Sequence, residues 1–104
     1  MSADKRPEWK DATSYSRNDR ERVPRTFDVT AGPVRLVVTC GHIACPGEWV
    51  MHGYGLNIDT EPLGLDAAEP AGKAMEEAER VALIKATRLL RAVQAIRDAR
   101  GEDA

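Results

Sequence analysis

The sequence has few aromatic residues and no long apolar stretch. Aromatics make up 5% of the chain, so a core must be built mainly from Val, Leu, Ile, Met and Ala. No stretch approaches the ~18 apolar residues of a membrane-spanning helix, and the charged N-terminus lacks the apolar segment of a signal peptide. We therefore expect no membrane contact and a cytoplasmic location, in which the two cysteines remain reduced.

Motifs of catalysis are also missing. Residues 53–55 (GYG) lack the helix and lysine that complete a phosphate-binding loop, and the acids at 76–79 are explained by the dipole of a predicted helix. Nothing in the spacing brings a cysteine, a histidine and Asp59 together as nucleophile, base and orienting acid. A chain of 104 residues also forms one small domain without room for a deep pocket. We expect no enzymatic activity and no catalytic residues.

What the sequence does contain is a strand-rich segment. Apolar and polar residues alternate over 26–30 and over 34–40, and Gly and Pro mark turns at 31–33 and 45–47. A returning strand follows at 48–52, and residues 56–58 continue it or form a fourth strand. Residues 59–69, with Pro62 and Gly64, read as a loop. The pattern predicts a three- to four-stranded antiparallel meander within residues 26–58.

A long helix is predicted over residues 67–100. Asp66 and Glu69 have the spacing of a capping box, and Gly101 is placed to end the helix before a tail at 101–104. Apolar residues recur at helical spacing along one side. This stripe consists of Met75, Ala78, Ala82, Ala86, Leu89, Val93 and Ile96, with Leu83 and Leu90 beside it. We expect an α+β domain at residues 25–100, with the sheet packed against this helix.

Residues 1–24 show no hydrophobic period and are rich in charge. We interpret them as a loosely ordered N-terminal arm, with Trp9 and Tyr15 as anchors onto the body. Basic residues such as Arg17 and Arg20 alternate with these aromatics, a combination that can contact phosphates and stack on bases. Together with the arginines of the helix, the arm suggests nucleic-acid binding as an alternative function.

One helix cannot cover both faces of a sheet. If the turn lies at 45–47, the odd-numbered residues Val37, Trp49 and Met51 face away from the helix and stay exposed. Exposed apolar patches on small proteins mark interaction sites. The sequence therefore predicts a non-enzymatic binding module, in which these residues, with Trp9, Tyr15, Arg17 and Arg20 of the arm, bind a protein partner or a second copy.

Both cysteines and one histidine lie within the stretch 39–49, TCGHIACPGEW. Cys40, His42, Cys45 and His52 supply two thiolates and two imidazoles, a set that suits tetrahedral zinc, although their C-x-H-x2-C-x6-H spacing differs from common zinc knuckles. A turn at 45–47 would place Cys40 opposite His52. The simpler interpretation is a hairpin tip without metal. A Cys40–Cys45 disulfide would need a turn at 41–44 instead, with Pro46 and Gly47 inside a strand. We expect no cofactor, with zinc as the alternative.

Several pieces of the chain resemble small uncharacterised proteins encoded by phages and prophages of high-GC bacteria. These pieces are W-K-D-A-x-S-Y-S-R at 9–17, P-R-T-F at 24–27, R-L-V-V-T at 35–39, P-G-E-W-V-M at 46–51 and the Ala/Arg-rich helix at 73–100. The resemblance implies an accessory protein that acts by binding host or phage components. It assigns no residue a role.

Overall fold

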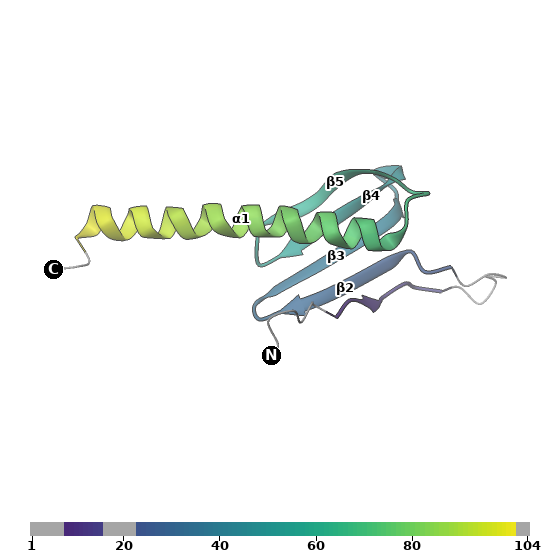
Figure 1. The fold of residues 1–104 in the computed structure, drawn as a ribbon, viewed down its shortest axis with the longest axis horizontal. Coiled ribbons are helices and arrows are strands. Elements are labelled where there is room, and N and C mark those ends of the chain that lie inside the picture. Colours follow the sequence, from purple (N-terminus) through teal and green to yellow (C-terminus); the bar gives the residue numbers. More distant parts are fainter. Residues whose placement is uncertain (1–7, 16–22, 102–104) are drawn as a thin grey trace.

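The computed structural model describes residues 8–15 and 23–101. These residues form one five-stranded antiparallel sheet with strand order β1-β2-β3-β4-β5, followed by one long helix (Figure 1). The elements are β1 (Lys10–Asp11), β2 (Thr26–Ala31), β3 (Val34–His42), β4 (Cys45–Tyr54), β5 (Ile58–Asp66) and α1 (Ala71–Arg100). The predicted α+β meander with a C-terminal helix is confirmed, with more strands than expected.

The strands that the pattern does not predict in full, β1 and β5, lie at the edges of the sheet. The short strand β1 comes from the predicted arm and bonds β2, with Lys10 opposite Asp28. The strand β5 occupies residues that we expected to form a loop, and it pairs with β4 although it contains Pro62 and Gly64. An edge strand tolerates both residues, because one side of its backbone needs no ladder bonds. The loop prediction for this segment is therefore wrong.

The hairpin between β3 and β4 turns at Ile43–Ala44 rather than at 45–47. Cys40 pairs with Trp49 and His42 with Cys45, with an irregularity between Cys40 and His42. Since a shift in register moves side chains to the opposite face, the odd-numbered residues of β4 share a face with the even-numbered residues of β3. The predicted pairing of Cys40 with His52 is wrong.

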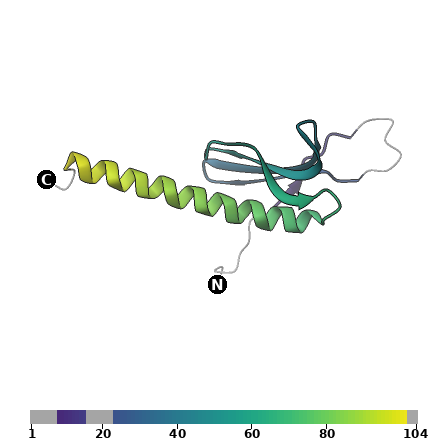
Figure 2. The same ribbon diagram turned by 90° about the horizontal axis from the view of Figure 1, so that it is seen from above.

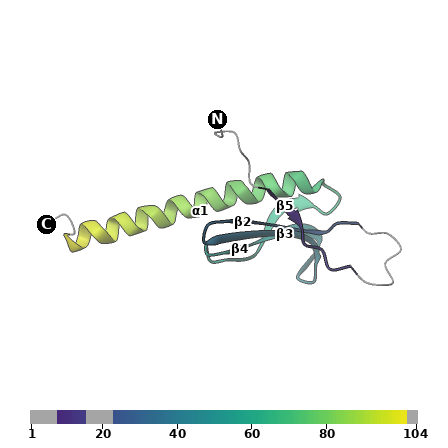
Figure 3. The same cartoon turned by 90° about the horizontal axis from the view of Figure 1, so that it is seen from below.

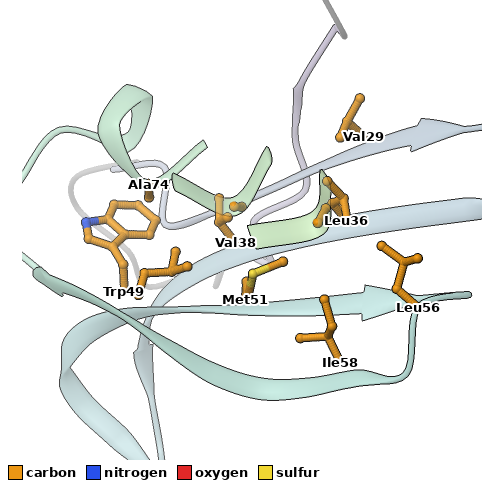
Figure 4. Packing of buried hydrophobic residues seen from close by; sticks show 11 residues of the cluster. Val29, Leu36, Val38, Trp49, Met51, Leu56, Ile58 and Ala74 are labelled. Atoms are coloured by element: carbon orange, nitrogen blue, oxygen red, sulfur yellow. The ribbon is translucent and has the colours of Figure 1, made fainter. Parts of the chain in front are cut away.

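The core lies between this face and α1. Trp49 and Met51 point to the same side as Leu36 and Val38, toward the helix (Figure 4). Trp49 is 3% exposed and Met51 is fully buried, and the indole N–H of Trp49 donates to the carbonyl oxygen of Glu69 at 3.0 Å. The remaining buried members of the cluster are Val29, Leu56, Ile58, Leu63, Ala74, Ala78 and Ala82. The prediction that Trp49 and Met51 are exposed is therefore wrong.

Helix α1 begins four residues later than predicted. Asp66 ends β5 and its carboxylate accepts the N–H of Ala68 at 2.8 Å, so residues 67–70 form a turn and Pro70 occupies the N-cap without a side-chain bond. The C-terminal end of α1 agrees with the prediction. Gly101 has a left-handed backbone, with φ of 70°, and its N–H donates to the carbonyl oxygens of Arg97 and Asp98. The described part of the chain contains no helix long and apolar enough to cross a membrane.

Only the first half of α1 contacts the sheet. Its buried residues are Ala74, Ala78 and Ala82, and every residue from Ala86 onward is exposed. A helix of 30 residues is about 45 Å long, whereas a strand of 10 residues spans about 33 Å. The second half therefore extends beyond the sheet, as Figures 1, 2 and 3 show from three directions. We call residues 83–100 the overhang.

Candidate interaction surfaces

The overhang exposes a stripe of large apolar side chains. Exposed fractions are 69% for Leu83, 45% for Leu89, 59% for Leu90, 46% for Val93 and 58% for Ile96. Together with the exposed Ala86 these six residues, here called the apolar stripe, recur at spacings of three and four that keep them on one side of a helix. The stripe continues the side on which Ala82 contacts the sheet, so it faces the space beyond the end of the sheet.

An apolar hollow lies where the overhang leaves the sheet. It has a volume of about 350 Å³ and is lined by Ala31, Val34, Leu36, Leu56, Glu79, Ala82, Leu83 and Ala86. The first four residues come from the sheet and its turns, and the last three link the hollow to the stripe. Glu79 contributes a charged side chain to the lining of the hollow. The hollow and the stripe therefore form one continuous apolar surface.

Glu79 is held in place by the N-terminal segment. The indole N–H of Trp9 donates to its carboxylate at 2.7 Å, and the Trp9 ring packs against the core cluster. Trp9 therefore anchors the segment to the body, as the sequence predicts. Tyr15 is half-buried, and its hydroxyl donates to the carboxylate of Asp11 at 2.6 Å. The predicted binding residues Arg17 and Arg20 lie outside the described residues.

The opposite side of the overhang carries charge. Ile84, Arg88 and Arg91 follow one another at spacings of four and three, and with Leu83 and Thr87 they line a shallow depression. Arg88 and Arg91 are exposed. Between Leu83 and Ile96 the overhang is thus amphipathic, with the apolar stripe on one side and Arg88 and Arg91 on the other.

The sheet face away from α1 is lined by a row of polar and aromatic side chains. The Arg35 guanidinium bonds the Asp28 carboxylate at 2.7 Å and lies 5.6 Å from the centre of the Tyr54 ring. The Tyr54 ring stacks on the His52 ring with 6.3 Å between their centres, and the ring centres of His52 and His42 are 5.7 Å apart. Val37 is on the same face, paired with His52, but is only 8% exposed.

The hairpin therefore brings His42 and His52 together without Cys40. Nδ1 of His42 accepts the N–H of Ala44 at 3.0 Å, and Nδ1 of His52 accepts the N–H of Thr60 at 3.2 Å. In both imidazoles the Nδ1 lone pair is therefore engaged by a backbone N–H. Within the described residues no three His, Cys, Asp or Glu side chains are placed to hold a metal. These contacts do not support the zinc hypothesis.

Cys40 lies on the opposite side, packed against the core cluster. Both cysteines are free thiols. Burial is the main cause that raises the pKa of the Cys40 thiol, and the nearby Arg25 opposes the rise. Cys40 also lines a polar hollow between the N-terminal segment and the strands, with Thr13, Ser14 and Arg25. A half-buried thiol with a raised pKa is a poor nucleophile.

The surface that sequence reasoning missed is the overhang. The helical spacing reveals its apolar residues but predicts that all of them pack against the sheet. Chain length contained the missing signal, because a helix of about 45 Å cannot be covered by strands of nine or ten residues. The exposed second half of the helix follows from this mismatch.

Comparison with known proteins adds no relative. No family model, no curated protein and no solved structure matches the chain. The proposals that follow rest on the geometry and chemistry of the described residues.

Proposed function

We propose that this protein is a non-enzymatic interaction module that binds a protein partner through the apolar stripe of the overhang. The observation that carries the proposal is a half-helix in which every residue from Ala86 to Gly101 is exposed while Leu89, Leu90, Val93 and Ile96 share one side. Isolated helices of this length are marginal in water, and most helical stability comes from packing of an apolar side. An overhang of this composition is therefore suited to a partner.

The proposed surface differs from the one expected from sequence. Trp49 and Met51 are buried under α1 and cannot reach a partner in the folded protein. An accessory role in a phage or prophage remains a prediction, and the interaction surface is compatible with it because such proteins act by binding.

The test is site-specific photo-crosslinking in the cells that produce the protein. Benzoylphenylalanine placed at Leu90, on the stripe, should form a covalent adduct with a protein. The same residue at Ile84, which is 41% exposed on the other side of the helix, is the matched control and should give little adduct. Equal labelling at both positions, or none at Leu90, would contradict the proposal.

Nucleic-acid binding is the second candidate, favoured by the exposed Arg88 and Arg91 on the outer side of the overhang. Fluorescence anisotropy with labelled single-stranded and duplex oligonucleotides tests it. Binding through these arginines should weaken steeply between about 50 and 200 mM salt, and Arg88→Glu with Arg91→Glu should abolish it. The apolar-stripe proposal instead predicts an interaction that persists at high salt.

A further inference from the structure

We infer that the partner of the apolar stripe is a second copy of this chain, whose overhang packs antiparallel against the first. This inference rests on the proposed function, since it names the occupant of the same surface. Three observations lead to it: the symmetry of the stripe, the position of the sheet beside it, and the hollow with Glu79 at the inner end of the overhang.

The stripe has the same spacing when read in either direction. Successive members of Leu83, Ala86, Leu89, Leu90, Val93 and Ile96 are separated by three, three, one, three and three residues. A two-fold axis across the helix near Leu89 and Leu90 therefore places apolar side chains opposite apolar side chains from Leu83 to Ile96. Self-complementarity of this kind is what an interface between two identical copies requires.

The sheet selects the antiparallel direction. The stripe continues the side of α1 that contacts the sheet through Ala74, Ala78 and Ala82, so a partner helix must lie beyond the end of the sheet, in the same layer (Figure 2). In a parallel pair both sheets would lie between the two helices, which pack only about 8–10 Å apart. In an antiparallel pair each sheet lies at the far end of the partner's overhang, beside its last turn, and the stripes meet.

The hollow receives the far end of the partner's overhang. In the antiparallel pair, Ile96 of one copy lies next to Leu83 and Ala86 of the other, at the mouth of the apolar hollow of about 350 Å³. The last turn of the helix carries Arg97 and Arg100, and this turn then approaches Glu79 at the hollow. Opposite charges meet at both ends of the interface, which favours the same direction and register.

Oligomeric state is the first test. Sedimentation velocity over a range of concentrations should give about twice the 11.4 kDa chain mass for the wild type. Leu90→Glu with Val93→Glu should weaken the dimer by at least about 100-fold. The matched control, Ile84→Glu, puts the same charge on the other side of the helix and should leave the dimer unchanged. Far-UV circular dichroism confirms that each variant is folded, which is expected because all three positions are exposed in one copy.

Disulfide trapping tests the direction. In a background of Cys40→Ala and Cys45→Ala, one chain carries Leu83→Cys and a second, tagged chain carries Ile96→Cys. Mixing and mild oxidation should join the two different chains, whereas Ile96→Cys alone should form little homodimer. Efficient self-crosslinking through Ile96→Cys would indicate a parallel pair and overturn the inference.

Failure of the inference can be separated from failure of the proposed function. A wild-type chain that stays monomeric at millimolar concentration overturns the second copy as partner. If the photo-crosslinker at Leu90 then captures a different protein, the stripe is still an interaction site. A dimer that survives Leu90→Glu with Val93→Glu but is lost in Ile84→Glu would overturn the inference, and the absence of any adduct at Leu90 would overturn the proposed function.

Discussion

At the scale of single residues, Met51 and Ile43 show how much depends on strand register. The sequence predicts that Met51 faces away from the helix and is exposed, yet Met51 is fully buried, whereas Ile43 in the hairpin turn is 94% exposed. We expect Met51→Ala to lower the free energy of unfolding by about 2–5 kcal/mol, because it leaves a cavity in the core. Ile43→Ala should change it by less than about 0.5 kcal/mol.

Urea denaturation followed by tryptophan fluorescence measures both values. The experiment is best done on the Leu90→Glu, Val93→Glu background, so that association does not contribute to the measured stability. A Met51→Ala protein as stable as its parent would contradict the pairing of Met51 with Val38. It would indicate that the Met51 side chain lies on the surface.

The Cys40 thiol provides a second prediction at this scale. Burial raises its pKa, so a smaller fraction is thiolate at pH 8 than in the unfolded chain. We expect iodoacetamide to alkylate Cys40 several-fold more slowly in the folded protein than in urea, as measured by mass spectrometry of the peptide that contains it. A rate equal in both states would indicate that the thiol is not protected by the fold.

Residue types alone predict some of these details and not others. Gly101 ends the helix as expected, because a left-handed position after a helix favours glycine whatever the tertiary structure. The turn at Ile43–Ala44 is not predictable in the same way, since Pro46 and Gly47 suggested a later turn and neither Ile43 nor Ala44 is a typical turn residue. The irregularity beside Gly41, where φ is 79°, accommodates it.

At the scale of elements, the turn between β4 and β5 depends on Gly55. Its φ is 94°, and a Cβ built there would lie 2.6 Å from the carbonyl oxygen of Pro33. We expect Gly55→Ala to destabilise the protein by at least about 1–2 kcal/mol, because the left-handed backbone and the contact with a backbone atom both disfavour a side chain.

Gly47→Ala is the matched control for this substitution. Gly47 lies near the start of β4, away from this turn, and a Cβ there meets no atom within 4 Å, so the change in stability should be small. Thermal unfolding of the two variants gives the comparison. Equal midpoints would show that the turn adjusts freely and that Gly55 has no special place in it.

Strand β5 is an example of an element that the local sequence pattern does not predict. Its Pro62, its Gly64 and the positive φ of Thr60 are features of loops. Pairing with β4 and burial of Ile58 and Leu63 nevertheless hold the segment in the sheet. These contacts are made with distant residues, so the local pattern could not indicate them.

At the scale of the whole molecule, half of the candidate site could be predicted. The apolar stripe from Leu83 to Ile96 is visible as a period in the sequence, but its exposure depends on where the sheet ends. That end is set by the hairpin registers and by the hollow between Leu36, Leu56 and Ala82, which are tertiary features. A pattern of helical apolar residues thus predicts that a side is buried, without indicating whether the same chain buries it.

Amide hydrogen exchange distinguishes the two halves of α1. The amides of the sheet-packed half, around Ala78 and Ala82, should be protected at any protein concentration, because their burial is internal to one copy. The amides of residues 86–100 have no such packing. If two overhangs pair, their protection should rise with concentration, in step with the dimer fraction from sedimentation.

The Leu90→Glu, Val93→Glu variant supplies the control for this experiment. In it, residues 86–100 should exchange quickly at every concentration while the amides near Ala78 are unaffected. Protection of 86–100 that is equally strong at micromolar and millimolar concentration in this variant would mean that the overhang is stable by its own helix propensity. The helical structure of residues 86–100 would then not depend on pairing with a second copy, and its protection could not be used as evidence for a dimer.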